Sequence, residues 1–293
     1  MLVTPLPGVD RETLRSTLRD LHGAALDARS ASGPDVSHDP LCGYFDWVGA
    51  ALRSLQTQVS AADIDRLVLT RQYELLLSAG GNGSWDAETE ASAVQGLLDA
   101  ELDARVSGFA GACEDLERQI DRWARTGLLV VLDTSVYITH PQKLEQLDLA
   151  ALMGVREEPI HILVPIVVVD ELDGLKQQGR DTARWRAGYT LAVLDRVCAG
   201  NAQQGRLGEE EFTPLNSGGI PRGEVTIELL FDPPGHVRLP INDDEIIDRA
   251  LAVQPLAARP VTLLTYDTGQ STRARAAGLP VIKPARPIGD EPR

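Results

Sequence analysis

The periodicity of the sequence changes at Gly127, and this change limits the possible folds more than any other feature. Before Gly127, apolar residues recur at the spacing of amphipathic helices. After it come four short unbroken apolar runs, at residues 128–132, 161–165, 261–265 and 279–283. Helical patterns accompany them, at about residues 166–177, 182–199, 243–253 and 270–277. Strands that alternate with helices predict a parallel sheet. We therefore expect an all-α domain over residues 1–126 and an α/β domain over residues 127–293.

The first domain is expected to be helical throughout. Its patterns predict a helix around residues 14–25, a break at 30–40, helices at about 41–59 and 63–77, and a turn at 79–83. Asp86 is a suitable N-cap for the last and longest helix. That helix carries an apolar seam formed by Leu98, Leu102, Arg105/Val106, Phe109, Cys113, Leu116, Ile120 and Trp123. The seam favours the core of a helical bundle, and the alternative is a coiled coil that dimerises or binds a protein partner.

Residues 205–240 interrupt the alternation of strands and helices. They contain a glutamate run, a Gly- and Pro-rich stretch, a strand-like segment at 224–231 and a Pro-Pro-Gly turn at 233–235. We interpret the region as an inserted loop with a hairpin.

The charge balance limits the class of ligand. With 28 basic and 43 acidic residues the net charge is −15, which argues against a protein that binds duplex nucleic acid through bulk electrostatics. The deficit is −9 before Gly127 and −6 after it, so a local basic groove in the second domain remains compatible.

Two further features bear on the compartment. No apolar run approaches the length of a membrane span and the N-terminus lacks a secretory leader, so we expect a cytoplasmic protein with no membrane association. Cys42, Cys113 and Cys198 lie far apart without metal-ligand spacing, so we expect buried, reduced thiols.

Acidic residues follow the ends of the predicted strands. Asp133 directly follows the first strand, and Asp267 lies two residues after the third. Glu171 lies in the helix after the second strand, and Asp243 and Asp244 open a later helix. Because ligands of an open parallel sheet bind at the carboxyl ends of its strands, we expect these acids to converge.

A cluster of this kind calls for a cation. Converging carboxylates repel one another unless a divalent ion neutralises them, and ligand oxygens without His or Cys suit Mg²⁺ or Mn²⁺. Taken singly, each acid has an ordinary explanation, as a helix cap, a first-turn acid, a turn residue or a solvated helix residue. Only the set indicates a metal site.

The segments VVLDTSVYI, LVPIVVVDELDGLK, INDDEIIDRAL and VTLLTYDTGQSTRARAAGLPVI resemble, in this order, the four acidic motifs of PIN domains. These are the nuclease domains of toxin–antitoxin ribonucleases and of endonucleases in eukaryotic nonsense-mediated decay. The resemblance covers about residues 127–284 and is strongest to the subgroup with an insertion before the third motif. It implies a PIN-like α/β/α sandwich with a central parallel sheet, and a metal-dependent endoribonuclease that hydrolyses RNA phosphodiester bonds with Mg²⁺ or Mn²⁺.

The resemblance also implies roles for single residues. The catalytic and metal-binding acids are Asp133, Glu171, Asp243 and Asp267, and the supporting hydroxyls are Ser135 and Thr268. Asp244 is the alternative third acid, and Asp243 is preferred because Ile246 and Ala250 then fall at the motif's inward positions. A bound cation would orient and acidify a water, and Asp267 is the expected acceptor of its proton. Whether one or two cations bind is left open.

Basic residues after the second and fourth motifs are candidates for contact with substrate phosphates. They are Lys176, Arg180, Arg184, Arg186, Arg273 and Arg275, and the alternative is a solvated charged face. Trp185 and Tyr189 are able to stack on bases of single-stranded RNA, but packing in the interior is the favoured explanation. We interpret His140 as an ordinary loop residue.

Three other functions are weighed against a ribonuclease. A haloacid-dehalogenase-type phosphatase needs a second Asp where Ser135 stands, and it leaves the ELDGLK segment unexplained. A non-catalytic PIN-fold RNA-binding or scaffold module is disfavoured by the retention of every acid. A toxin of a toxin–antitoxin pair would be shorter, so the additional N-terminal residues make a housekeeping or regulatory ribonuclease at least as plausible.

Overall fold

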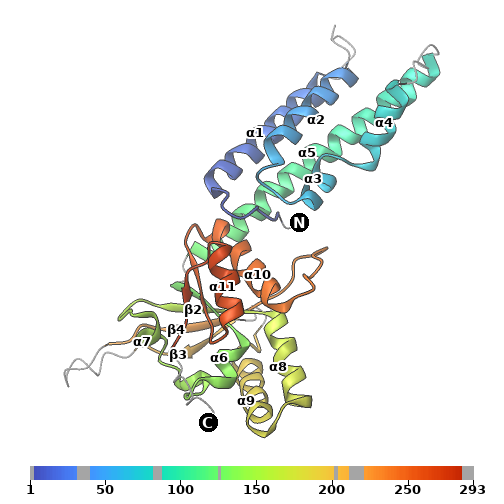
Figure 1. Ribbon diagram of the computed structural model, residues 1–293. Helices are drawn as coiled ribbons and strands as arrows, with labels where there is room; N and C mark the ends of the chain where they lie inside the picture. The colour runs from blue at the N-terminus through green and yellow to red at the C-terminus, as the bar shows by residue number, and fades with distance from the viewer. Residues whose placement is uncertain are drawn as a thin grey trace. The chain divides into compact units, whose positions relative to one another are not determined.

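The computed structural model describes residues 3–31, 40–81, 88–124, 127–200, 204–210 and 221–285 (Figure 1). The chain forms two compact units, Met1–Arg122 and Trp123–Arg293. Although α5 (Glu88–Ala124) spans 37 residues, no helix in the described ranges combines the length and the apolar character needed to cross a membrane.

The first unit consists of helices. Before α5 come α1 (Arg11–Ser30), α2 (Pro40–Leu55), α3 (Ala61–Leu67) and α4 (Arg71–Gly81). Asp10 caps α1 by accepting a hydrogen bond from the backbone N–H of Thr13. The buried face of α1 is the predicted one, formed by Leu14, Leu18, Leu21 and Ala25.

Most of the predicted seam of α5 is buried, whereas Val106 and Cys113 are partly exposed. Leu98, Leu102, Phe109, Leu116 and Ile120 are each at most 7% exposed. The ring of Trp47 in α2 meets that of Phe109 edge to face, and α1 adds an ion pair from Arg15 to Glu117. Packing against the helices of its own unit therefore accounts for the seam.

Three helix boundaries differ from the prediction. The helix expected at 63–77 is two helices, because the Thr70 hydroxyl accepts the Tyr73 N–H at the start of α4 and donates to buried Glu101. Helix α2 ends at Leu55, and Val59 forms a β-bridge with Pro5. The turn expected at 79–83 is wrong in part, since α4 continues to Gly81; residues 82–83 and Asp86 lie outside the described ranges.

The second unit is built on a six-stranded sheet with the order β3-β4-β2-β1-β5-β6. The strands are β1 (Leu128–Leu132), β2 (Ile160–Pro165), β3 (Gln204–Gly208), β4 (Val225–Leu230), β5 (Val261–Leu264) and β6 (Val281–Ile282). Only β3 is antiparallel to its neighbour. The chain moves outward from β1 to β2 and β4, then returns to β5 on the other side of β1. Such a reversal opens a crevice at the carboxyl end of the central strand.

Helices lie on both sides of this sheet (Figure 1). On one side are α6 (Thr134–Thr139), α8 (Ile166–Gln178) and α9 (Asp181–Val197), and on the other are α10 (Asn242–Ala257) and α11 (Thr268–Ala276). The 3-10 helix η1 (Leu144–Gln146) and helix α7 (Leu149–Met153) lie between α6 and β2, where the sequence predicted no element. The expected α/β/α sandwich with a central, mostly parallel sheet is confirmed.

The hairpin expected in residues 205–240 is present, since β3 pairs antiparallel with β4, but its description as an insertion needs correction. Strand β4 belongs to the central sheet, where it pairs in parallel with β2 from Ile160↔Val225 to Pro165↔Leu230. Its charged residue Glu228 is only 3% exposed, because its carboxylate lies 3.0 Å from Nε2 of the buried His161. Because a charged residue in a strand usually indicates an exposed face, Glu228 made β4 difficult to predict as a core strand.

The cysteines also differ from expectation. Only Cys198 is buried, whereas Cys113 is partly exposed and Cys42 is exposed. Cys42 and Cys113 lie on helices whose buried faces are formed by other residues, so their thiols lie outside the core.

Candidate active site

Asp133 is fixed at the carboxyl end of the central strand. It is the N-cap of α6 and is 5% exposed. Its Oδ2 accepts hydrogen bonds from the Ser135 N–H at 3.2 Å and the Thr265 hydroxyl at 2.9 Å. The buried Gln270 amide, with its nitrogen facing the carboxylate as the neighbouring groups require, adds contacts of 3.1 and 3.2 Å. Helix capping and site formation thus use the same carboxylate.

Thr265 connects the first and fourth acids. Its side chain has no solvent exposure, and its hydroxyl oxygen accepts the Asp267 N–H at 2.9 Å while donating to Asp133. Asp267 is exposed and caps α11, with Oδ1 accepting the Gln270 N–H at 2.8 Å. The Ser135 hydroxyl adds a second link by accepting the Tyr266 N–H at 3.0 Å.

Glu171 lies in the second turn of α8 and is half-buried. Its Oε2 accepts the Thr134 hydroxyl, and its Oε1 accepts the Asn242 amide at 2.8 Å. One carboxylate is therefore oriented by residues adjoining both Asp133 and Asp243.

Asp243 and Asp244 have different surroundings, because neighbouring residues of a helix point about 100° apart. Partial burial raises the pKa of Asp243, and the negative charges of Asp133, Asp267 and Glu171 raise it further, against a smaller opposing effect of Arg273. Asp244 instead pairs with Arg273, whose Nη1 lies 2.9 Å from both of its carboxylate oxygens. The structure thus brings Asp133, Glu171, Asp243 and Asp267 together and directs Asp244 to an arginine.

The donor set at this cluster fits a hard divalent cation. Four carboxylates converge without a histidine or cysteine among them, which is the oxygen-rich composition that Mg²⁺ and Mn²⁺ prefer. No three of these four acids place ligand atoms within 4.8 Å of one another, whereas a different group among the described residues does. Asp133 and Glu171 are positioned by neutral donors, which leaves the negative charge of the cluster intact.

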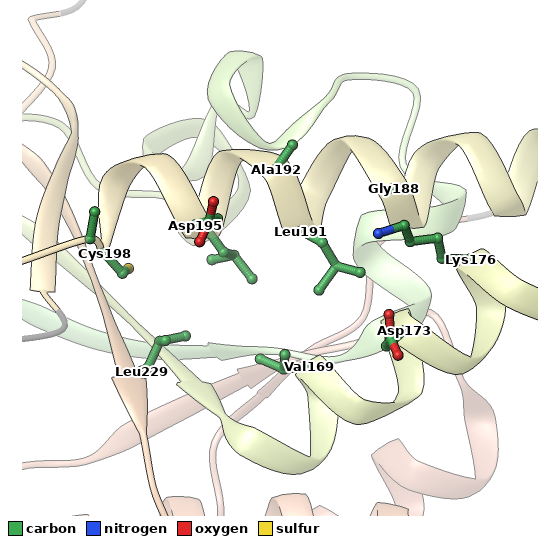
Figure 2. A pocket seen from close by; sticks show the side chains of 11 residues that line it. Val169, Asp173, Lys176, Gly188, Leu191, Ala192, Asp195, Cys198 and Leu229 are labelled. Carbon is green, nitrogen blue, oxygen red and sulfur yellow. The ribbon is translucent and has the colours of Figure 1, made fainter.

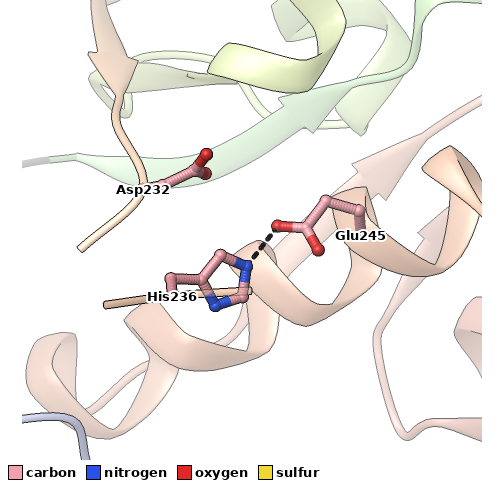
Figure 3. Close-up of side chains that lie close together, drawn as sticks. All are labelled: Asp232, His236 and Glu245. Atoms are coloured by element: carbon pink, nitrogen blue, oxygen red, sulfur yellow. Dashed lines mark hydrogen bonds and ion pairs between the residues drawn. The ribbon is translucent and has the colours of Figure 1, made fainter. Parts of the chain in front are cut away.

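That other group is Asp232, His236 and Glu245, beside the loop between β4 and α10 (Figure 3). His236 Nε2 lies 2.7 Å from Oε1 of the buried Glu245, whose Oε2 accepts the Leu239 N–H at 2.8 Å. Arg238 pairs with Asp232 and, on α8, with Asp170. These bonds fasten the loop to the two helices that carry Asp243 and Glu171. No sequence pattern predicted this anchor.

The predicted phosphate-binding residues are distributed over several sites. Arg186 donates to the carbonyl oxygens of His140, Pro141 and Gln142 at 2.6–2.9 Å, so it fastens the loop after α6. Arg273 is paired with Asp244 as described. The predicted supporting residue Thr268 accepts a hydrogen bond from Lys283. Arg180, Arg184 and Arg275 are exposed.

Lys176 belongs to a separate cavity of about 530 Å³ between α8, α9 and β4 (Figure 2). Its apolar lining includes Val169, Leu191 and Leu229, and its polar lining includes Asp173 and Asp195. None of the four clustered acids lines this cavity.

Trp185 corrects the expectation that both aromatic residues of α9 pack in the interior. Its side chain is 53% exposed, whereas that of Tyr189 is partly exposed. The buried face of α9 is formed by Ala187, Thr190, Val193 and Leu194, and Trp185 lies outside this face.

Sequence reasoning missed the neutral residues that orient the acids. They are Thr134, Asn242, Thr265 and Gln270. Each lies within three residues of a predicted acid, so the motif segments contained the signal, but the pairing of donor and acceptor depends on contacts between distant segments.

Comparison with known families agrees with this geometry. A family model described as PIN domain matches residues 130–284, more than half of the chain and all four clustered acids. Among curated proteins, none matches. The sheet, the order of the acids and the family match lead to one conclusion: this chain belongs to the PIN domain family.

Proposed function

We propose that the protein is a Mg²⁺- or Mn²⁺-dependent endoribonuclease. One arrangement carries the proposal: Thr265 bonds to both Asp133 and the Asp267 N–H, while Glu171 accepts bonds from the residues next to Asp133 and Asp243. An enzyme that neutralised such a cluster with arginines would lose a cation site. Here Arg273 is paired with Asp244, outside the set. Membership of a generally nucleolytic family supports the same activity.

The residues have separable tasks in this proposal. Asp133, Glu171 and Asp243 would hold the cation, which when bound supplies Lewis-acid stabilisation of the phosphate and lowers the pKa of a water. Asp267 is exposed and uses Oδ1 to cap α11, while its Oδ2 accepts no hydrogen bond from a described residue. That oxygen is the proposed acceptor of the attacking water's proton as the phosphodiester bond breaks.

The test is cleavage of internally labelled single-stranded RNA in Mn²⁺. We expect wild-type activity that excess EDTA abolishes. Asp133→Asn should reduce the rate by more than the roughly 10–100-fold typical of side chains that only support a metal ligand. Asp195→Asn is the matched control, because this acid lies in the same unit but lines the separate cavity of Figure 2. Its activity should equal that of the wild type.

The outcomes separate the alternatives. Cleavage that persists in Asp133→Asn or in EDTA would refute the assigned site. Binding of Mn²⁺ without cleavage of any RNA would instead support a non-catalytic RNA-binding or scaffold module.

A further inference from the structure

Three side chains form a group at the surface of the second unit: Trp185 and Tyr189 of α9, and Lys143 just before η1. We name this group the aromatic platform. The two rings stack with centroids 5.5 Å apart and planes inclined by 19°. The Lys143 ammonium lies 5.0 Å from the Trp185 ring centre and 5.1 Å from that of Tyr189. Trp185 is 53% exposed, and Tyr189 and Lys143 are partly exposed, so solvent reaches the indole and the cation beside it.

The aromatic platform is held in place from below. The Tyr189 hydroxyl donates to Glu145, which also pairs with Arg196. Arg186, next to Trp185 in α9, donates to three consecutive carbonyl oxygens of the loop that ends at Lys143. Side chains that are already ordered lose less conformational entropy when a ligand binds. The bonds around the aromatic platform therefore lower the entropic cost of binding a ligand there.

The same loop connects the aromatic platform to the clustered acids. It leaves α6 at His140, and α6 is only six residues, or about 9 Å, long from its cap at Asp133. The His140 ring lies 6.1 Å from the ring of Tyr266, the residue that precedes Asp267. The clustered acids and the aromatic platform therefore lie at the two ends of one segment, which consists of α6 and the short loop after it. An RNA strand with a phosphate at the acids would follow this segment to reach the aromatic platform.

The chemistry of the aromatic platform matches a single-stranded nucleic acid. Bases that are not paired offer flat faces that stack on aromatic rings, and the adjoining phosphates attract cations. Arg180 and Arg184 lie exposed at the start of α9 and form no ion pair with a described residue. The positive charge near the aromatic platform contrasts with the whole chain, which carries a net charge of −15. In a duplex the base faces are stacked on one another inside the helix, so they are not accessible for stacking on an exposed indole.

We propose that Trp185 and Tyr189 stack on a base of single-stranded RNA, whose neighbouring phosphate contacts Lys143. The proposal rests on the proposed nuclease function, since it identifies where the substrate of that site is held away from the acids. Trp185 supplies the exposed indole, Tyr189 supports it from the next turn of α9, and Lys143 supplies the charge.

Binding and cleavage are measured separately, so that the two proposals can fail independently. Fluorescence anisotropy of labelled oligouridylate with the full chain in excess EDTA measures binding alone. Trp185→Ala should weaken binding roughly 5- to 150-fold, the range expected for loss of one stacked base. Trp185→Phe should retain most of the affinity. Phe231→Ala is the matched control, because Phe231 is 44% exposed in the same unit but lies outside the aromatic platform. It should bind as the wild type does.

Two further arms identify the mode of binding. Lys143→Gln should lower the slope of log affinity against log salt by about 0.7, as expected for one phosphate contact to a single strand. Duplex RNA should bind more weakly than oligouridylate, and with the same affinity to Trp185→Ala and the wild type.

The results that would overturn the aromatic platform are specific. Unchanged oligouridylate binding by Trp185→Ala refutes it, even if the wild type cleaves RNA in Mn²⁺. Equal losses for single-stranded and duplex RNA also refute it, because stacking would then not be the cause. Trp185-dependent binding without any cleavage supports RNA binding by the aromatic platform and refutes the proposed nuclease function. If Trp185 serves a protein partner instead, its substitution leaves every RNA affinity unchanged.

Discussion

Replacement of Thr265 by valine tests whether this hydroxyl holds the acid cluster together. Valine keeps the volume of the threonine, which is fully buried, and removes only the group that donates to Asp133 and accepts the Asp267 N–H. The backbone of β5 and its pairing with β1 should be unaffected, because the substitution spares every ladder hydrogen bond.

The magnitude follows from three bonds of the hydroxyl: to Asp133 at 2.9 Å, from the Asp267 N–H at 2.9 Å and from the Gln270 amide at 2.8 Å. A hydrogen bond to a charged group contributes about 1.5–3 kcal/mol and a neutral one about 0.5–1.5 kcal/mol. Their sum, about 2.5–6 kcal/mol, is the expected loss in the free energy of unfolding of the second unit. Asp133 keeps its bonds from the Ser135 N–H and the Gln270 amide, so the unit should still fold.

The assay is urea denaturation followed by a probe of the second unit, because two compact units need not unfold in one step. Thr262→Val in the same strand is the matched control, since the Thr262 side chain forms no hydrogen bond to the clustered acids. It should shift the midpoint far less than Thr265→Val. RNA cleavage by Thr265→Val should fall about 10–100-fold, as for other side chains that orient a ligand. Equal midpoints for the two variants, or full activity of Thr265→Val, would refute the proposed role of the hydroxyl.

Four other perturbations give distinct outcomes. Asp243→Asn should abolish RNA cleavage whereas Asp244→Asn should retain most of it, and equal losses in a side-by-side cleavage assay would contradict the choice of third acid. His236→Ala should lower the free energy of unfolding by about 1–3 kcal/mol, because Glu245 keeps its charge in a buried position without the imidazole; an unchanged urea midpoint would show that the anchor is dispensable. Arg186→Met should speed amide hydrogen exchange around residues 140–142, and unchanged exchange rates would mean that this arginine does not hold the loop. Mn²⁺ at a hundredfold excess over its Kd should stabilise the second unit by about 2.7 kcal/mol, and the same gain in Asp133→Asn would place the ion elsewhere.

The parallel core of the fold is predictable because its strands are short, apolar and followed by helices. Strand β1 matches the predicted run at residues 128–132, and the acid that ends it has to lie at the ligand-binding edge. The prediction fails at β4, where the burial of Glu228 depends on His161, 67 residues away. A charged residue in a strand pattern indicates an exposed face until the partner that buries it is known.

Side-chain partners in the candidate site show the same limit. The segments that carry Asp133 and Glu171 are visible in the sequence as strand and helix patterns. The donation from Thr134 to Glu171 joins residues 37 positions apart, and that from Asn242 joins residues 71 positions apart. Arg186 likewise looked like a phosphate ligand, because no local pattern shows that three backbone carbonyls of another loop occupy its guanidinium.

The kind of group that orients each acid bears on its function. Around the cluster the orienting donors are hydroxyls, amides and backbone N–H groups, which fix a carboxylate without cancelling its charge. The nearby arginines are directed elsewhere, Arg238 to Asp170 and Asp232, and Arg273 to Asp244. A cluster serving stability alone would gain from the opposite arrangement, because uncompensated repulsion lowers the free energy of unfolding. Preserving the negative charge at a cost in stability suits a site that binds a cation, and this supports the proposed metal-dependent activity independently of the family match.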